Sequence, residues 1–380
     1  MTLSIKNALA AAALSGAVLA GGAQAEQLRL SLGLPETHAF YTPMQKFGAA
    51  LSDAGIEAQL YSLQVLSVVE ATSGVRDGLV DAAMVLFPYF SNEFSEANLA
   101  AELSMLATSG TPAAMPGAAM NGATMEYIFH KCPTCLQQFK NQNQVYVSGT
   151  STTEYALVCN RPVGNLADMA GKRFRAGAGN YTRMAEFVGA TAVSMGGADV
   201  FDALDKGVVE CTMQPVASIL DFRYIEVTNS VLTGFPGGVF SGVGLTNFNR
   251  DKWQGLTTEQ RAAALKAGAK AAAAGYFNNV AMDETSASAA REAGMNIFVA
   301  DAELLAKVAE FVEADMPVVK DELTDKYGLQ DVDAKIETVH GLIEKWKGLT
   351  NAPDMTEEAL AQLYWDEVLS KVDPATYGMD

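Results

Sequence analysis

The cysteines are the residues of this sequence whose spacing most directly suggests chemistry. Cys132 and Cys135 form a CxxC pair, which in a thioredoxin-like fold would be a redox site opening a helix just after the first strand. Here the pair follows a helical-looking stretch, 120–130, and precedes a polar segment, 137–144. This context favours a local structural disulfide, with an exported redox enzyme as the alternative function. Zinc is less favoured, because the chain has 3 histidines and no second CxxC pair.

The other two cysteines, Cys159 and Cys211, fall at the end of one strand-like run and inside another. We expect a second disulfide between those two strands. Hydrolytic chemistry has little support, because the sequence has no G-x-S-x-G elbow, no H-E-x-x-H motif, and only His38, His130 and His340 as histidines. The sequence therefore predicts a protein that is not an enzyme and that uses no cofactor and no metal.

A pattern of strand, turn, helix and strand occurs twice, and its elements must position any site. The first copy spans 41–84 and the second spans 181–213. Each copy follows a strand-like run and ends in Gly-x-Val-acid before another strand, at 78–81 and at 207–210. Parallel strands need such a crossover helix, so each copy reads as a βα unit of an α/β lobe. Two similar α/β lobes predict a ligand-binding cleft between them.

The remaining segments predict lobes that are interwoven along the chain. Segment 109–122, rich in Gly, Pro, Ala and Met, is expected to be a loop over the first lobe, and the Gly-dense segment 235–244 is expected to be a return crossing between lobes. From Thr257 onward the chain is Ala-rich and reads as helical. We expect lobe I to comprise 26–150 plus about 245–275, and lobe II to comprise 151–244 plus parts of 276–380 with the C-terminal helices.

The N-terminus predicts export. Lys6 is followed by an apolar run, 8–20, and by Ala23-Gln24-Ala25, which together are typical of a secretory signal peptide over residues 1–25. We therefore expect cleavage near Ala25 and a periplasmic protein. The formal net charge of −18 argues against nucleic acid and against an anionic membrane surface as partners. An anionic ligand would need a local cationic pocket.

Two runs in the middle of the chain form a family pattern when they are read together. Segment 168–175 reads DMAGKRFR, segment 203–210 reads ALDKGVVE, and Pro215 follows shortly after. The chain resembles the solute-binding subunits of tripartite ATP-independent periplasmic (TRAP) transporters, of the dicarboxylate-binding-protein type. Their pattern is D-L-K-G-hydrophobic-K-hydrophobic-R followed by A-L-x-x-G-V-V-D. The LPETH segment at 34–38 fits the same family, and the resemblance covers most of the chain.

This resemblance implies an α/β, two-lobed periplasmic binding protein with hinge strands and a long lobe-spanning helix. Such a protein closes on an organic acid and delivers it to the membrane subunits of a TRAP transporter. Arg175 matches the family arginine that grips a substrate carboxylate, and a guanidinium at a strand end can do so through two charge-assisted hydrogen bonds. Gln214 stands where many members carry Asn, and Tyr155 stands where members for larger diacids often carry a second arginine. The sequence therefore favours a monocarboxylate, while a C4-dicarboxylate or a small hydroxy or keto acid stays open.

Aromatic residues near the ends of the expected strands are the remaining candidates. Pockets for small organic molecules have mostly apolar walls with a few placed polar groups, so an acid with an aromatic or apolar body is favoured. Arg183 could add a second cation, the alternative being a solvated helix face. The helical C-terminal third is compatible with a homodimer. The aromatic candidates, of which we expect about half to line the pocket, are Phe40, Tyr41, Phe87, Tyr89, Tyr181, Phe235 and Phe240.

Overall fold

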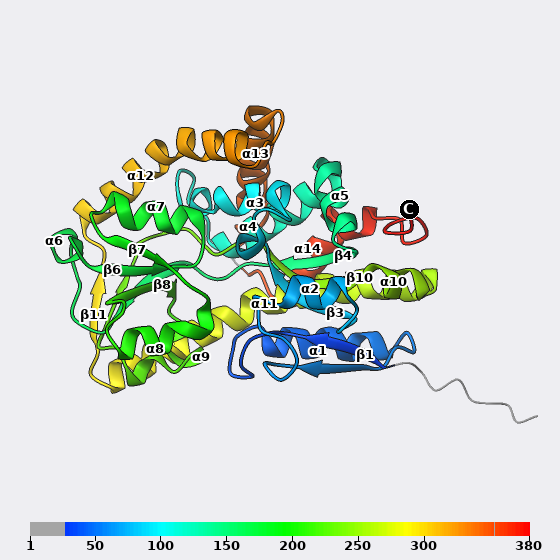
Figure 1. The fold of residues 1–380 in the computed structure, drawn as a ribbon, viewed down its shortest axis with the longest axis horizontal. Helices are drawn as coiled ribbons and strands as arrows, with labels where there is room; N and C mark the ends of the chain where they lie inside the picture. Colours follow the sequence, from blue (N-terminus) through cyan, green and yellow to red (C-terminus); the bar gives the residue numbers. More distant parts are fainter. Residues whose placement is uncertain (1–26, 353) are drawn as a thin grey trace, which may run out of the picture.

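The computed structural model describes residues 27–352 and 354–380, and the expected signal peptide lies outside these residues. Two β-sheets, each flanked by helices, form two lobes that lie side by side (Figure 1). We call the lobe built on the five-stranded sheet the first lobe and the lobe built on the six-stranded sheet the second lobe. The predicted two-lobed α/β fold class is confirmed.

The first sheet has the strand order β2-β1-β3-β10-β4, and the second has the order β11-β9-β5-β8-β6-β7. In the first sheet the strands are β1 (Leu28–Ser31), β2 (Ala58–Tyr61), β3 (Ala82–Leu86), β4 (Gln144–Thr150) and β10 (Val243–Asn249). In the second they are β5 (Tyr155–Cys159), β6 (Arg173–Ala176), β7 (Thr191–Ser194), β8 (Cys211–Pro215), β9 (Ser230–Thr233) and β11 (Asn296–Val299).

The repeat found in the sequence is also a repeat of topology. In the first lobe the chain runs through β1, α1 (Tyr41–Ser52), β2, α2 (Ala71–Arg76) and β3. The three strands are parallel and lie in the order β2-β1-β3. In the second lobe the chain runs through β6, α7 (Gly179–Phe187), β7, α8 (Val200–Asp205) and β8. These three strands are also parallel and lie in the order β7-β6-β8. An antiparallel strand then pairs with the third strand of each unit, β10 with β3 and β5 with β8.

The acid that ends each Gly-x-Val-acid motif joins two parallel strands of its lobe. Arg29 on β1 donates from its side chain to Asp81 at 2.9 Å and to the Gly78 carbonyl at 2.9 Å. Arg173 on β6 does the same with Glu210 at 2.5 Å and with the Gly207 carbonyl at 2.7 Å. The shared motif therefore encodes a repeated ion pair that fixes the first strand of each unit against the third.

The lobes are connected by long helices as well as by crossing strands. Helix α11 (Thr258–Glu292) begins with a capping box between Thr257 and Gln260. It packs on α1 and β4 in the first lobe and on α9 (Ser218–Asp221) and β11 in the second, so it spans both lobes (Figure 1). Helix α12 (Ala302–Asp321) then leads from the second lobe back towards the first, where α13 (Val332–Leu349) packs on α4 (Pro116–Glu126). The other helices are η1 (Phe87–Phe90), α3 (Ser95–Glu102), η2 (Ser104–Thr108), η3 (Tyr127–Lys131), α5 (Pro133–Asn141), α6 (Leu166–Met169), η4 (Gly197–Asp199), η5 (Tyr224–Glu226), α10 (Arg250–Gly255), η6 (Glu322–Lys326), α14 (Glu357–Glu367) and η7 (Leu369–Lys371).

The expectation of a loop over 109–122 is wrong in its second half, because α4 begins at Pro116. Proline is favoured in the first turn of a helix, where its missing N–H is not needed. The helix is buried on nearly all sides, so its sequence lacks the periodic polar face that marks a surface helix. Its small residues permit close packing, and a Cβ on Gly122 would overlap the Trp346 ring of α13.

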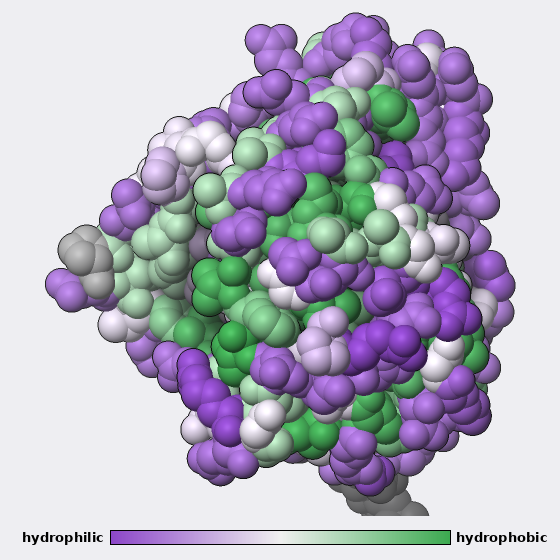
Figure 2. Space-filling view, turned by 90° about the vertical axis from the view of Figure 1, so that its left-hand side faces the viewer, coloured by the Kyte–Doolittle hydropathy of each residue, from purple (hydrophilic) through white to green (hydrophobic). Residues whose placement is uncertain are grey.

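The outer face of the second lobe mixes polar and apolar side chains, with apolar residues gathered near its centre (Figure 2). Val299 on the edge strand β11 has a relative exposure of 73% and Leu305 on α12 has one of 52%.

Within residues 27–352 and 354–380, no helix has both the length and the apolar character needed to cross a membrane.

Candidate functional site

A small cavity of ≈ 60 Å³ lies where the two lobes meet. Its first-lobe wall comes from the loop after β1, the end of β3 and η1, and its second-lobe wall comes from β5, β6, β8 and α9. Larger hollows of ≈ 420 and ≈ 610 Å³ lie elsewhere, and their walls include no residue of the second sheet. The small interlobe cavity is therefore the candidate site, because it is where the two halves of the repeat converge. Its lining residues are Leu34, His38, Phe40, Val68, Leu86, Tyr89, Thr152, Tyr155, Arg175, Gly197, Gln214, Pro215, Ser218, Asp221, Phe222, Phe240 and Asn279.

Arg175 is the cation of the cavity. It lies on β6 with a relative exposure of 2%. Its Nε and Nη2 donate to the Met195 carbonyl at 3.1 and 3.0 Å, and Nη2 also donates to the Tyr89 hydroxyl at 2.9 Å across the lobe boundary. A Cβ on Gly177 would come within 2.9 Å of both terminal nitrogens, so the glycine leaves room for the guanidinium.

The charge of Arg175 has no counter-ion among the described residues, and its Nη1 makes no hydrogen bond there. Burying an unpaired charge is costly, and an anion held by a guanidinium fork offsets that cost. The geometry therefore suits an anion that enters the cavity and accepts hydrogen bonds from Arg175.

Gln214 lies close to Arg175 because their strands are neighbours. Arg175 is paired in register with Thr212 on β8, and Gln214 follows two residues later on the same face of the sheet. The Gln214 Oε1 accepts hydrogen bonds from the Thr212 hydroxyl at 3.0 Å and from the Tyr224 hydroxyl at 2.9 Å. These two donors fix the amide orientation, so that Nε2 is the group left to donate to a molecule in the cavity.

Tyr155 begins β5 and forms part of the cavity wall. Its ring stacks on Tyr181 with centroids 4.4 Å apart and lies parallel to Phe240 at 6.2 Å. Burial raises the pKa of Tyr155 far above its ordinary value, so its hydroxyl stays protonated. The wall at this position is aromatic and uncharged.

The aromatic candidates separate into two groups. Phe40, Tyr89 and Tyr155 line the cavity, and so does Phe240 on the Gly-dense crossing. Tyr181 supports the cavity wall from behind through its stack on Tyr155. The others are not part of the lining: Tyr41 is half-buried on α1, Phe87 packs against Phe94 and Phe139 in the first-lobe core, and Phe235 is fully buried beside Pro236.

Two lining residues that sequence reasoning did not select are His38 and Asp221. The His38 Nδ1 accepts a hydrogen bond from the Phe40 N–H at 3.1 Å, and burial lowers the pKa of His38 to about 3, so the ring is neutral. Burial raises the pKa of Asp221 to about 7, and the Asp283 carboxylate adds to this rise, while a hydrogen bond from the Ala39 N–H opposes it. The His38 Nε2 lies 3.8 Å from the Asp221 Oδ2, and with a neutral ring this contact is not an ion pair.

A sequence signal existed for only one of these two residues. His38 closes the LPETH segment already recognised at 34–38, whereas Asp221 lies on a one-turn helix without any motif. Phe222, Tyr224 and Asn279 were missed for the same reason as Asp221. Their roles depend on tertiary neighbours and not on local pattern.

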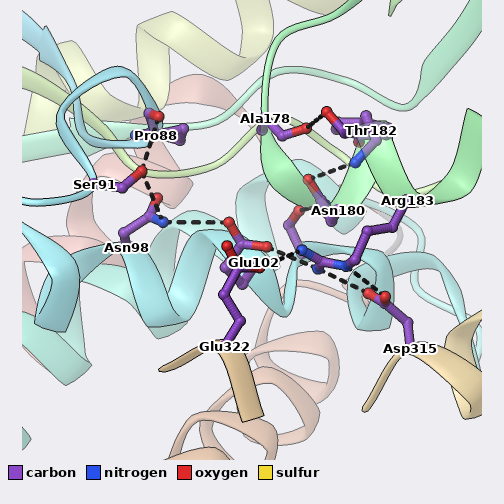
Figure 3. Close-up of polar contacts among 12 residues, drawn as sticks. Pro88, Ser91, Asn98, Glu102, Ala178, Asn180, Thr182, Arg183, Asp315 and Glu322 are labelled. Carbon is purple, nitrogen blue, oxygen red and sulfur yellow. Dashed lines mark hydrogen bonds and ion pairs between the residues drawn. The ribbon is translucent and has the colours of Figure 1, made fainter. Parts of the chain in front are cut away.

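Arg183 does not reach the cavity, so it is not a second cation there. Its guanidinium is enclosed by Glu102 on α3, Asp315 on α12 and Glu322 on η6 (Figure 3). The Nη2–Oε2 distance to Glu102 is 2.8 Å and the Nη1–Oε2 distance to Glu322 is 3.0 Å. The solvated-face alternative is wrong too, since the Arg183 side chain has a relative exposure of 15%.

Both cysteine pairs are disulfide-bonded and neither lines the cavity. Cys159 and Cys211 face each other across β5 and β8, with Cα atoms 4.0 Å apart. Cys132 and Cys135 close the first turn of α5. In the part of the chain that the structure describes, no group of three His, Cys, Asp or Glu side chains could hold a metal ion.

Comparison with solved structures identifies the same fold in known solute receptors. A TRAP solute-binding protein from Rhodoferax ferrireducens, solved with copurified benzoate, has a TM-score of 0.71 at 18% identity. The alignment covers 85% of this chain and 99% of the Rhodoferax chain. One from Bordetella bronchiseptica with bound (R)- and (S)-mandelate has a TM-score of 0.70 at 20% identity, covering 84% and 99%. A receptor from Bordetella pertussis that binds pyroglutamic acid has a TM-score of 0.68 at 20% identity, covering 84% and 99%.

No curated protein sequence resembles the chain closely enough to count as a match. The family model DctP, described as bacterial extracellular solute-binding protein, family 7, matches residues 34–322. That span includes both copies of the repeat and the whole cavity lining, and it confirms the resemblance to TRAP solute receptors. The chain therefore belongs to family 7 of the bacterial extracellular solute-binding proteins.

Proposed function

We propose that this protein captures an organic monocarboxylate in the periplasm and delivers it to the membrane subunits of a TRAP transporter. The observation that carries the proposal is the buried Arg175 guanidinium, which has no counter-ion among the described residues and lines the interlobe cavity. Arg175 would hold the ligand carboxylate through Nη1, and the Gln214 amide would donate a further hydrogen bond. Because both lobes supply the wall, lobe closure would surround the ligand and exclude water.

The walls favour an acid with one carboxylate and an aromatic or apolar body. Phe40, Tyr89, Tyr155 and Phe240 supply the apolar surface. A second ligand carboxylate would find no second cation among the described lining residues, and Arg183 is engaged by three acids outside the cavity. Benzoate, mandelate and pyroglutamate, which the similar receptors bind, each carry one carboxylate.

The redox alternative has less support. The Cys132–Cys135 disulfide lies on α5, away from the cavity, and the two residues are 2% and 0% exposed. Reactive cysteines are at least partly exposed, so this pair is better suited to a structural role.

Export through the signal peptide, with cleavage near Ala25, is part of the same proposal.

The test is binding measured by thermal shift and calorimetry against a panel of aromatic acids, keto acids and C4-dicarboxylates. A ligand at free concentration c that binds the native state stabilises it by RT ln(1 + c/Kd), so the melting temperature rises with ligand concentration and affinity, and the ligand is recovered unchanged. Loss of one partner of a buried charged pair costs on the order of 2–5 kcal/mol, so Arg175→Ala should weaken binding at least about thirtyfold. Arg175→Lys should rescue it only partly, because lysine lacks the planar fork.

Arg76→Ala is the matched control, because Arg76 is a half-exposed arginine paired with Asp77 at the surface. It should bind like the wild type. Unchanged affinity in both Arg175 variants would overturn the assignment of the carboxylate anchor, and consumption of the acid would favour an enzyme.

A further inference from the structure

We propose that Asp221 is a specificity-determining residue that accepts a hydrogen bond from an O–H or N–H group on the ligand. The ligand would thus be a hydroxy acid or an acid with an amide-type N–H, with its carboxylate on Arg175 and its donor on Asp221. This inference rests on the proposed function, since it takes Arg175 as the carboxylate anchor.

The first support is an unpartnered buried oxygen in the cavity wall. Asp221 has a relative exposure of 2% and lines the cavity. Its Oδ2 accepts a hydrogen bond from the Ala39 N–H at 3.3 Å, whereas its Oδ1 is buried without any hydrogen-bond partner among the described residues. Buried polar atoms are nearly always hydrogen-bonded, and leaving an acceptor unsatisfied costs free energy. A ligand donor would satisfy this oxygen.

The second support is that both lobes hold Asp221 in place. Asp221 lies on α9 of the second lobe, and its carbonyl accepts a hydrogen bond from the Thr37 hydroxyl of the first lobe at 2.8 Å. The Ala39 N–H reaches its carboxyl group from the same first-lobe loop. The acceptor is therefore positioned by the contact between the lobes, as expected for a group that reads the ligand in the closed state.

The third support is the chemistry of the surrounding groups. His38 accepts at Nδ1 from Phe40, so its Nε2 carries the proton, and the ring packs against Phe40 at 5.0 Å and Phe222 at 5.3 Å. Burial raises the pKa of Asp221 to about 7, and the charge of Asp283 on α11 adds to this rise. A second ligand carboxylate would meet the same unfavourable environment, whereas a donor on the ligand would stabilise the ionised form of Asp221. This part of the cavity thus holds a carboxyl acceptor and an uncharged imidazole N–H. Apart from Arg175 the described lining residues supply no cation, so this part suits a neutral group better than a second anion.

The experiment compares acids that differ by one donor: benzoate with 3-hydroxybenzoate, phenylacetate with mandelate, and cyclopentanecarboxylate with pyroglutamate. Calorimetry on the full exported protein should show, in at least one pair, that the donor-bearing acid binds at least tenfold more tightly. In Asp221→Asn the amide oxygen would take over the Ala39 bond and turn its NH₂ towards the cavity. The preference should then fall below threefold, while the donor-free acid keeps its affinity.

Asp221→Leu serves as a second variant of similar shape without an acceptor, and it should abolish the same preference. Asp283→Asn is the matched control, because Asp283 is a neighbouring half-buried acid that accepts from the Ala217 N–H at 2.6 Å outside the cavity lining. It should keep the preference.

Equal affinity within every pair, or a preference that survives in both Asp221 variants, overturns the inference and leaves the proposed function standing if Arg175→Ala still abolishes binding. Absence of binding by all six acids and by the wider panel counts against both.

Discussion

Arg183 on α7 and Glu102 on α3 form an ion pair between the two lobes, with 2.8 Å between Nη2 and Oε2. Asp315 and Glu322 complete the shell around the same guanidinium (Figure 3). Burial raises the pKa of Glu102, and the Arg183 charge opposes this rise. Asn98 also donates to Glu102 at 3.3 Å. The cluster therefore links the second lobe to the first at a point separate from the cavity.

Arg183→Gln should destabilise the protein by about 3–5 kcal/mol, because it leaves buried carboxylates without their cation. It should also weaken the binding of every ligand by a similar factor, since it acts on the lobe contact and not on the cavity wall. Urea unfolding and calorimetry measure the two effects.

Lys345→Gln is the control for Arg183→Gln, because Lys345 joins Glu126 and Glu367 at the surface and should cost less than about 1 kcal/mol. A selective loss of one ligand in Arg183→Gln would contradict the assignment of Arg183 to the lobe contact.

Tyr155 should decide between monocarboxylates and dicarboxylates. In the wild type, benzoate-like or branched keto acids should outcompete succinate and malate, because a second buried carboxylate would lack a cation. Tyr155→Arg places a guanidinium in the wall between Tyr181 and Phe240, and it should shift the preference towards the diacids. Competition binding measures both the preference and its shift. A wild type that prefers C4-dicarboxylates tenfold would refute the predicted preference for monocarboxylates.

The Arg173–Glu210 ion pair should give a pH-dependent stability contribution. The hydrogen bond from Arg173 lowers the pKa of Glu210 below its ordinary value. A carboxylate with a depressed folded-state pKa stabilises the protein above its unfolded pKa and loses that contribution as the pH falls through the folded value. Glu210→Gln should therefore cost about 1 kcal/mol at pH 7, since half-exposed Arg173 is partly screened, and progressively less as the pH falls below 4.5. Thermal unfolding at several pH values tests this, and a cost that grows in acid would contradict it.

The two disulfides should differ in their contribution to stability. Cys159–Cys211 has a sequence separation of 52 and Cys132–Cys135 one of 3. Loop-closure entropy then predicts about 4 kcal/mol for the first and about 2 kcal/mol for the second. Unfolding of the Cys159→Ala/Cys211→Ala and Cys132→Ala/Cys135→Ala variants measures both. Mass spectrometry of the exported protein under non-reducing conditions should find no free thiol.

Several elements could be predicted from local pattern. The strand at 155–159 and the helical C-terminal third were expected from the sequence and are present. The loop expected over 109–122 contains the start of α4 at Pro116. This difference arises where burial and tertiary packing override local composition.

The sequence by itself determined the repeated βα units, the strand that carries Arg175 and the pairs of cysteines, because these depend on spacing along a few neighbouring residues. Only the tertiary structure decided which side chains share the cavity. Ala39 and Asp221, 182 positions apart, meet at 3.3 Å, and Arg183 is drawn into an acidic cluster formed by three other helical segments. Such contacts between residues that are distant in the sequence depend on how the lobes pack on each other. Local periodicity reports which face of an element is buried, but it carries no information about which distant element covers that face.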